Sequence, residues 1–143
     1  MREDYISKEC WYMSMAMLAA KRSKDPNTQV GCTIINPDGI VVSMGYNGFP
    51  IGCSDQELPW QKHSANPLET KFPYVCHAEM NAILNTNDES VRGCTLYATL
   101  FPCNECAKMI IQAGIVEVVY LCDKSRDKPL VQASRHMFDL CGM

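Results

Sequence analysis

Apolar and polar residues along this 143-residue chain follow two periods, one helical and one strand-like. The first apolar face lies between Lys8 and Arg22, where the spacing predicts an amphipathic helix. The apolar side of that helix is expected to carry Trp11, Met15, Leu18 and Ala19. The helix should end before Asp25-Pro26-Asn27, because a proline disfavours helical backbone in the residue that precedes it.

Two short stretches rich in Val and Ile come next and predict a β-hairpin. They run from Gln29 to Asn36 and from Ile40 to Met44, and Pro37-Asp38-Gly39 supplies the turn between them. A segment without periodicity then begins at Gly45 and reaches to about Tyr74, with prolines at positions 50, 59, 67 and 73. Since a loop this long inside a domain is usually functional, we expect it to border or cover a site.

The second half of the chain alternates helices and strands. We expect helices at His77–Leu84, Cys103–Ala113 and Leu130–Leu140, and strands at Thr95–Leu100 and Val116–Leu121. The whole order predicts an α/β fold, specifically a three-layer α/β/α sandwich around a mixed β-sheet. Residues 1–143 have the length of one ordinary domain, so we expect a single one.

Composition and charge narrow the class of protein. Hydrophobic residues make up 47% and charged residues 20%, as in globular proteins, and no apolar run approaches the ~18 residues of a membrane span. The chain begins with the charged residues Arg2, Glu3 and Asp4 and lacks the apolar core of a secretory signal there, so we expect a cytoplasmic protein. A net charge of −3 argues against a broad nucleic-acid surface, which needs clustered Lys and Arg. We therefore expect no nucleic-acid partner and no membrane partner.

Nine cysteines are present, and we expect reduced thiols rather than disulfides in such a compartment. Only Cys103 and Cys106 have the spacing of metal ligands. They belong to the stretch Pro102-Cys103-Asn104-Glu105-Cys106, which follows His77-Ala78-Glu79 earlier in the chain. This H-x-E…P-C-x-x-C pattern is the recognised signature of zinc nucleobase deaminases.

The pattern predicts three zinc ligands, His77, Cys103 and Cys106, and one acid that is not a ligand, Glu79. A structural zinc site usually takes four protein ligands, whereas a catalytic site takes three and leaves a position for water. Bound zinc lowers the pKa of that water to about 7. Glu79 would then act as base and later as acid, moving a proton to the substrate and to the leaving amine.

Three alternatives remain open from these residues. A lone Cys-x-x-Cys can be redox-active or structural, and a lone His-x-Glu carries little information. The same zinc chemistry also serves deaminases of different cytosine nucleotides and of tRNA or single-stranded DNA, although the polynucleotide enzymes need a basic groove and stacking platforms. A catalytically silent zinc module is the third alternative, and the presence of Glu79 argues against it.

The chain also resembles the deoxycytidylate (dCMP) deaminases of the cytidine/deoxycytidylate zinc deaminase superfamily along nearly its whole length. The resemblance rests on the segments Lys21–Gly31, Gly45–Gly48, Gly52–Asp55, Leu58–Trp60, Cys76–Leu84 and Phe101–Lys108. It implies a cytidine-deaminase-like fold and hydrolysis of dCMP to dUMP and ammonia, which feeds thymidylate synthesis.

The resemblance also implies residue roles. Zinc would be held by His77, Cys103 and Cys106, with Glu79 as the proton shuttle. Asn47 is expected to contact the sugar hydroxyl, and the backbone of Ala78 and Thr99 is expected to contact the base edge. Ser23, Lys24 and Asn27 are the candidates for contacts with the phosphate and sugar.

Family members are typically homohexamers that dCTP activates and dTTP inhibits, each with Mg²⁺, so the resemblance implies these properties too. Two departures stand out. Ser125 follows Asp123-Lys124 where relatives carry an aromatic residue, and the usual fifth strand is missing after the last helix. We therefore expect a sheet whose last edge lacks that strand.

Overall fold

The computed structural model describes all residues from 1 to 143, and its centre is one mixed four-stranded sheet. The strands are β1 (Gly31–Ile35), β2 (Val41–Tyr46), β3 (Thr95–Leu100) and β4 (Glu117–Cys122). Their order across the sheet is β2-β1-β3-β4. β1 pairs antiparallel with β2 and with β3, while β3 pairs parallel with β4. The expected mixed sheet is confirmed, and it ends at β4 without a fifth strand.

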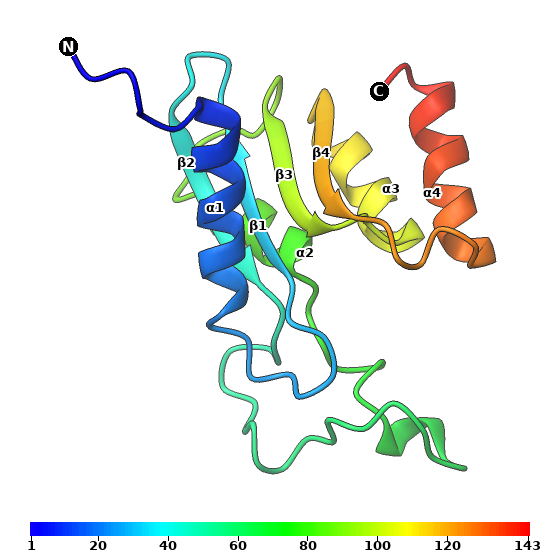
Figure 1. Cartoon of the computed structure of the whole chain (residues 1–143). Coiled ribbons are helices and arrows are strands. Elements are labelled where there is room, and N and C mark those ends of the chain that lie inside the picture. The colour runs from blue at the N-terminus through cyan, green and yellow to red at the C-terminus, as the bar shows by residue number, and fades with distance from the viewer.

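Helices cover both faces of this sheet, which confirms the three-layer α/β/α prediction (Figure 1). On one face α1 (Lys8–Ala20) crosses β1, β2 and β3. On the other face lie α2 (Ala78–Leu84) and α3 (Asn104–Gln112), and α4 (Pro129–Leu140) packs against α3. None of these helices combines the length and apolarity needed to cross a membrane.

The predicted apolar face of the first helix is wrong at two of its four positions, Trp11 and Leu18, while Ala19 is buried and Met15 is partly buried. Trp11 is 46% exposed and Leu18 69% exposed, and α1 instead buries Tyr12, Ala16, Ala19 and Ala20. The reason is a close approach to the sheet. A Cβ on Gly31 would lie 1.7 Å from the carbonyl oxygen of Ala16, so only alanine-sized side chains fit where the helix crosses this strand.

Several predicted boundaries also shift. The first strand begins at Gly31 rather than Gln29, and the second continues through Gly45 to Tyr46, where the sequence suggested a loop. Gly45 stays in the strand because its backbone faces Cys32 and lies directly under α2. The other elements lie within about two residues of their predicted positions, which is the usual uncertainty of helix and strand ends.

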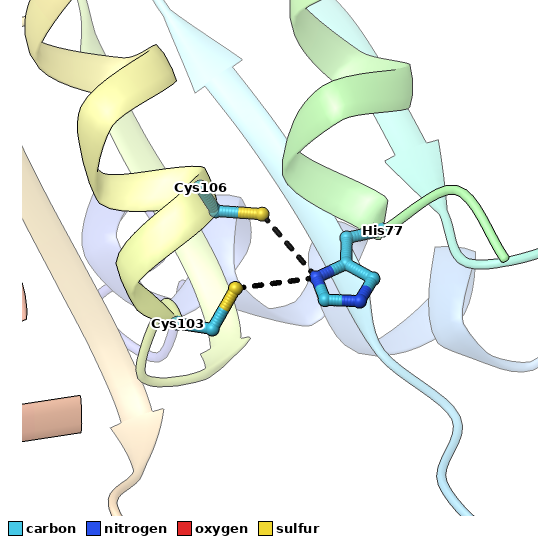
Figure 2. Close-up of side chains that lie close together, drawn as sticks. All are labelled: His77, Cys103 and Cys106. Atoms are coloured by element: carbon cyan, nitrogen blue, oxygen red, sulfur yellow. Dashed lines mark hydrogen bonds between the residues drawn. The ribbon is translucent and has the colours of Figure 1, made fainter. Parts of the chain in front are cut away.

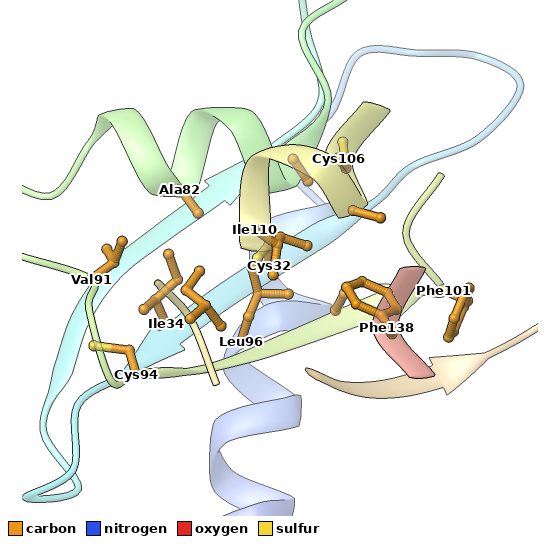
Figure 3. Packing of buried hydrophobic residues seen from close by; sticks show 14 of the residues in the cluster. Cys32, Ile34, Ala82, Val91, Cys94, Leu96, Phe101, Cys106, Ile110 and Phe138 are labelled. Atoms are coloured by element: carbon orange, nitrogen blue, oxygen red, sulfur yellow. The ribbon is translucent and has the colours of Figure 1, made fainter. Parts of the chain in front are cut away.

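The main core lies between the sheet and the α2–α3–α4 layer (Figure 3). Cys32 and Ile34 from β1 meet Leu96 from β3 and Ile110 from α3, all of them fully buried. Phe101 and Phe138 extend this core under α4. Helices α2 and α3 are therefore fixed to the sheet by the packing of their inner faces, and their N-terminal ends lie at the same end of the molecule (Figure 1).

A long segment, residues 47–76, joins β2 to the residue before α2. It contains only one short 3₁₀ helix, η1 (Pro67–Glu69), and an isolated bridge pairs Gly48 with Cys76 at its base. Figure 1 shows its outer part extending beyond the sheet at the end where α2 begins. The segment is thus closed at its base by backbone hydrogen bonds, while its tip lies away from the core.

Candidate metal centre

The first turns of α2 and α3 meet at this end of the sheet and bring three potential ligands together. His77 is the N-cap residue of α2 and Cys103 the N-cap residue of α3, both with extended backbone. Neither side chain caps its own helix, so both are free to point towards one another. Cys106, one turn into α3, completes the group (Figure 2).

The distances suit a zinc ion. His77 Nδ1 lies 3.4 Å from Cys103 Sγ and 3.4 Å from Cys106 Sγ, and all three ligand atoms lie within 4.8 Å of one another. Tetrahedral zinc with its usual bond lengths would separate nitrogen from sulfur by roughly 3.6 Å. One imidazole and two thiols are also the donor types that zinc prefers, so these residues fit the ion that the sequence predicts.

The two thiols are not equivalent. The hydrogen bond with Cys106, together with His77, lowers the pKa of Cys103 to about 4, although burial acts in the opposite direction. The hydrogen bond with Cys103 and burial raise the pKa of Cys106 well above its usual range. The pair therefore carries one thiolate and one thiol at neutral pH, and the thiolate in turn raises the pKa of His77 through their hydrogen bond.

Glu79 lies beside this group without belonging to it. It is only 4% exposed, and its Oε2 is 3.5 Å from Cys106 Sγ. Burial raises the pKa of its carboxyl group, and its negative charge helps to raise the pKa of the buried Cys32 thiol on β1. A carboxyl group with a raised pKa, next to a three-ligand metal site, is suited to accept and return a proton.

The other predicted site residues lie at the same end of the molecule. Most of their polar groups already form hydrogen bonds with other residues of this chain. Asn47 is buried; its Oδ1 accepts a hydrogen bond from Val30 N (2.8 Å) and its Nδ2 donates to Thr28 O (2.9 Å). Thr99 Oγ1 accepts from Gly31 N at 3.1 Å. Ala78, the first residue of α2, is fully buried beside His77.

Residues of the predicted phosphate segment contact the long segment 47–76. Ser23 donates to the carbonyl oxygen of Asn47, Lys24 pairs with Asp55, and Asn27 Nδ2 donates to Trp60 O. The Lys24 side chain remains 65% exposed, and the Lys24 ammonium and the Asn27 amide each retain unused N–H groups. Ser125, where relatives carry an aromatic residue, lies half-buried in the turn between β4 and α4.

Two residues at this end of the molecule were not found from the sequence. Asp25 and Lys71 form a buried ion pair between the turn after α1 and the base of the long segment. Burial raises the pKa of Asp25, but hydrogen bonds from Lys71 and from two backbone N–H groups outweigh it and hold that pKa below its ordinary value. A single aspartate and a single lysine 46 positions apart give no pattern from which a pair could be inferred.

Comparison with known proteins agrees with this geometry. The sequence profile of the "Cytidine and deoxycytidylate deaminase zinc-binding region" matches residues 6–122. This chain therefore belongs to the cytidine and deoxycytidylate deaminase family, which confirms the resemblance described above.

Individual members are close relatives. The deoxycytidylate deaminase of Pongo abelii is 54% identical over 142 residues, which span 99% of this chain and 80% of the relative. The Homo sapiens enzyme is 53% identical over the same extent. Among solved structures, the dCMP deaminase of cyanophage S-TIM5 in complex with dCMP and dUMP has a TM-score of 0.71 and 30% identity, covering 93% of this chain and 95% of its own.

Proposed function

We propose that this protein catalyses the hydrolytic, zinc-dependent deamination of dCMP to dUMP and ammonia. The observation that carries this proposal is the position of Glu79, a buried carboxyl group beside a three-ligand site to which it does not belong. In the proposal His77, Cys103 and Cys106 hold zinc and Glu79 is the catalytic acid and base. A purely structural zinc site would have no need of such a group.

The choice of dCMP rests on the relatives. The deoxycytidylate deaminases of Pongo abelii and Homo sapiens share more than half of their aligned residues with this chain. The cyanophage structure that holds dCMP and dUMP has the same fold over nearly the whole chain. These similarities favour a free mononucleotide over a polynucleotide substrate.

The reaction exchanges the amino group of the cytosine ring for an oxygen atom from water. Bound zinc supplies Lewis acidity that makes a water molecule acidic near neutral pH. Glu79 Oε2 would take one proton from that water and pass it to the ring nitrogen while the water oxygen bonds to the amino-bearing carbon. It would then take the second proton from the same oxygen and give it to the amino group, which leaves as ammonia as the carbon–nitrogen bond breaks and the carbonyl forms. The raised pKa of Glu79 favours this role, because the carboxylate is then a stronger base towards the water and the group holds the proton until it is transferred.

We also propose the substrate contacts that the family resemblance implies. Asn47 would meet the sugar hydroxyl, since its Oδ1 can accept a second hydrogen bond, and the backbone near Ala78 and Thr99 would meet the base. Among the remaining candidates, Lys24 and Asn27 have unused N–H groups for the phosphate, whereas the Ser23 hydroxyl donates to the backbone.

The wider properties of the family complete the proposal. Residues 1–143 would act as one catalytic domain in the cytoplasm, where a reducing environment keeps Cys103 and Cys106 available for metal. The product dUMP would supply thymidylate synthesis. A homohexamer regulated by dCTP and dTTP with Mg²⁺ is part of the same proposal, and the outward apolar residues Trp11, Met17 and Leu18 of α1 offer surface for subunit contacts.

An ultraviolet assay of deamination tests the substrate directly. With one zinc ion per chain, we expect rapid loss of the cytosine absorbance with dCMP and slow loss with deoxycytidine, because phosphate-binding donors would be left without a partner. CMP and dCTP as substrates complete the comparison, and the rates with dCMP and CMP are each measured with and without dCTP as activator. Equal kcat/KM values for dCMP and deoxycytidine would contradict a mononucleotide substrate.

A further inference from the structure

The ion pair between Lys71 and Asp25 differs from every other ion pair in the structure. The Lys71 side chain is 6% exposed and the Asp25 side chain 0%, while each of the other four pairs has at least one partner more than a third exposed. Buried ion pairs add little net stability compared with apolar residues of the same shape. Their geometry, by contrast, is directional, so a buried pair can fix one arrangement of the segments it joins.

Both oxygens of the Asp25 carboxylate are fully engaged. Oδ1 accepts hydrogen bonds from the backbone N–H groups of Asn27 (2.8 Å) and Thr28 (3.3 Å). Oδ2 accepts from Lys71 Nζ and from Asn47 Nδ2, the latter at 3.4 Å. One carboxylate thus joins three parts of the chain: the turn after α1, the residue that follows β2, and the far end of the segment 47–76.

These three parts meet at the base of the segment 47–76. Asn47 and Lys71 lie near the two ends of the long segment, and the Gly48–Cys76 bridge closes the same base with backbone hydrogen bonds of 3.0 and 2.7 Å. Cys76 precedes His77 directly in the chain. A shift of Lys71 or Asp25 would therefore reach Asn47 on one side and the residue next to a metal ligand on the other.

We propose that Lys71 and Asp25 are positioning residues for the substrate pocket. They hold Asn47, the turn at residues 23–28 and the base of the segment 47–76 in one arrangement beside the metal ligands, and they do not touch the substrate themselves. The inference rests on the proposed deamination of dCMP, since it assigns these residues to the pocket of that reaction.

The first test separates substrate binding from chemistry and from folding. In Lys71→Met we expect KM for dCMP to rise by about tenfold or more, because the Asp25 charge is left buried without its partner. The value of kcat should fall much less, and zinc should remain at one ion per chain. Lys71→Arg keeps the charge and should restore part of the loss. Lys62→Met changes an exposed lysine of the same segment and is the matched control.

A double variant tests whether the two residues act as a pair. If they do, Lys71→Met/Asp25→Asn should raise KM no more than the worse single variant, because neither charge is then left unpaired. Additive increases would overturn the pairing. A KM for Lys71→Met equal to that of Lys62→Met, or a parallel loss of kcat, zinc and folded protein, would overturn the positioning role.

Chymotrypsin digestion gives a second measure that does not depend on activity. Its aromatic cleavage sites in the segment include Trp60 and Tyr74, and no variant changes either of them. We expect zinc-loaded Lys71→Met to be cut within residues 47–76 faster than the wild type and Lys62→Met, with the rest of the chain protected. If the wild type fails to deaminate dCMP, the proposed function fails, while digestion still decides whether Lys71 holds the segment; equal cleavage rates would show that it does not.

Discussion

At the scale of single residues, the two cysteines of the metal centre differ in their protonation. Cys103, with a pKa of about 4, is a thiolate at neutral pH, whereas its hydrogen-bonded neighbour Cys106 keeps its proton. The thiolate also favours the protonated form of His77. Zinc binds deprotonated ligands, so metal binding must expel protons from Cys106 and from the protonated fraction of His77.

The protonation of these ligands predicts how zinc affinity changes with pH. Between pH 6 and 8 Cys103 is already ionised, so it does not make the zinc affinity depend on pH. The dependence comes from Cys106 and His77, whose raised pKa values mean that they must lose protons when zinc binds. Affinity should therefore fall by about tenfold or more for each unit that the pH is lowered. Competition with a chelator at pH 6, 7 and 8 measures this slope, and an affinity unchanged over the range would show that no proton is displaced.

At the scale of helices and strands, the site depends on how closely α2 lies on the sheet. A Cβ added to Gly45 on β2 would lie 2.4 Å from Ala78 O and 2.5 Å from Ala82 N, within the backbone of α2. Ser43 on the same strand also donates a hydrogen bond to Ala82 O. Because His77 precedes the first turn of α2, the position of this ligand follows from the contact between the two elements.

Gly45→Ala should therefore weaken both the fold and the metal site. We expect the free energy of unfolding to fall by about 1–3 kcal/mol, the usual effect of overpacking, and zinc to be released faster to a chelator. Gly48→Ala is the matched control, since a Cβ at Gly48 would meet nothing within 4 Å. Urea unfolding and zinc release of the two variants provide the comparison, and equal behaviour would refute a role for this close contact.

The same contacts explain what the sequence could and could not predict. Periodicity located every strand and each of the four α-helices, and the motif spacing identified His77, Glu79, Cys103 and Cys106 as one group. The apolar face of α1 was misassigned because hydrophobicity favoured Trp11 and Leu18, whereas the glycine backbone opposite required alanines. The Asp25–Lys71 pair was missed because long-range pairing of single charges leaves no local pattern.

At the scale of the whole molecule, the packed core holds the metal ligands, and the connecting segments carry the proposed substrate contacts. The buried core between the sheet and the α2–α3–α4 layer fixes the ends of α2 and α3 that carry the ligands. The long segment 47–76 and the turn after α1 meet at the same end and supply the proposed substrate contacts. Rigid packing can thus hold the metal ligands, while the specificity for a nucleotide is assigned to the connecting segments.

The central claim is that Glu79 moves protons beside a zinc ion that it does not bind. The most direct measurement is the rate of ammonia release from dCMP by the wild type and by Glu79→Gln at equal zinc content. We expect both proteins to hold one zinc ion per chain and the variant to be slower by at least ~10²–10⁴-fold, the usual contribution of acid–base catalysis. A glutamine variant that retains the wild-type rate, or one that has lost its zinc, would contradict this account.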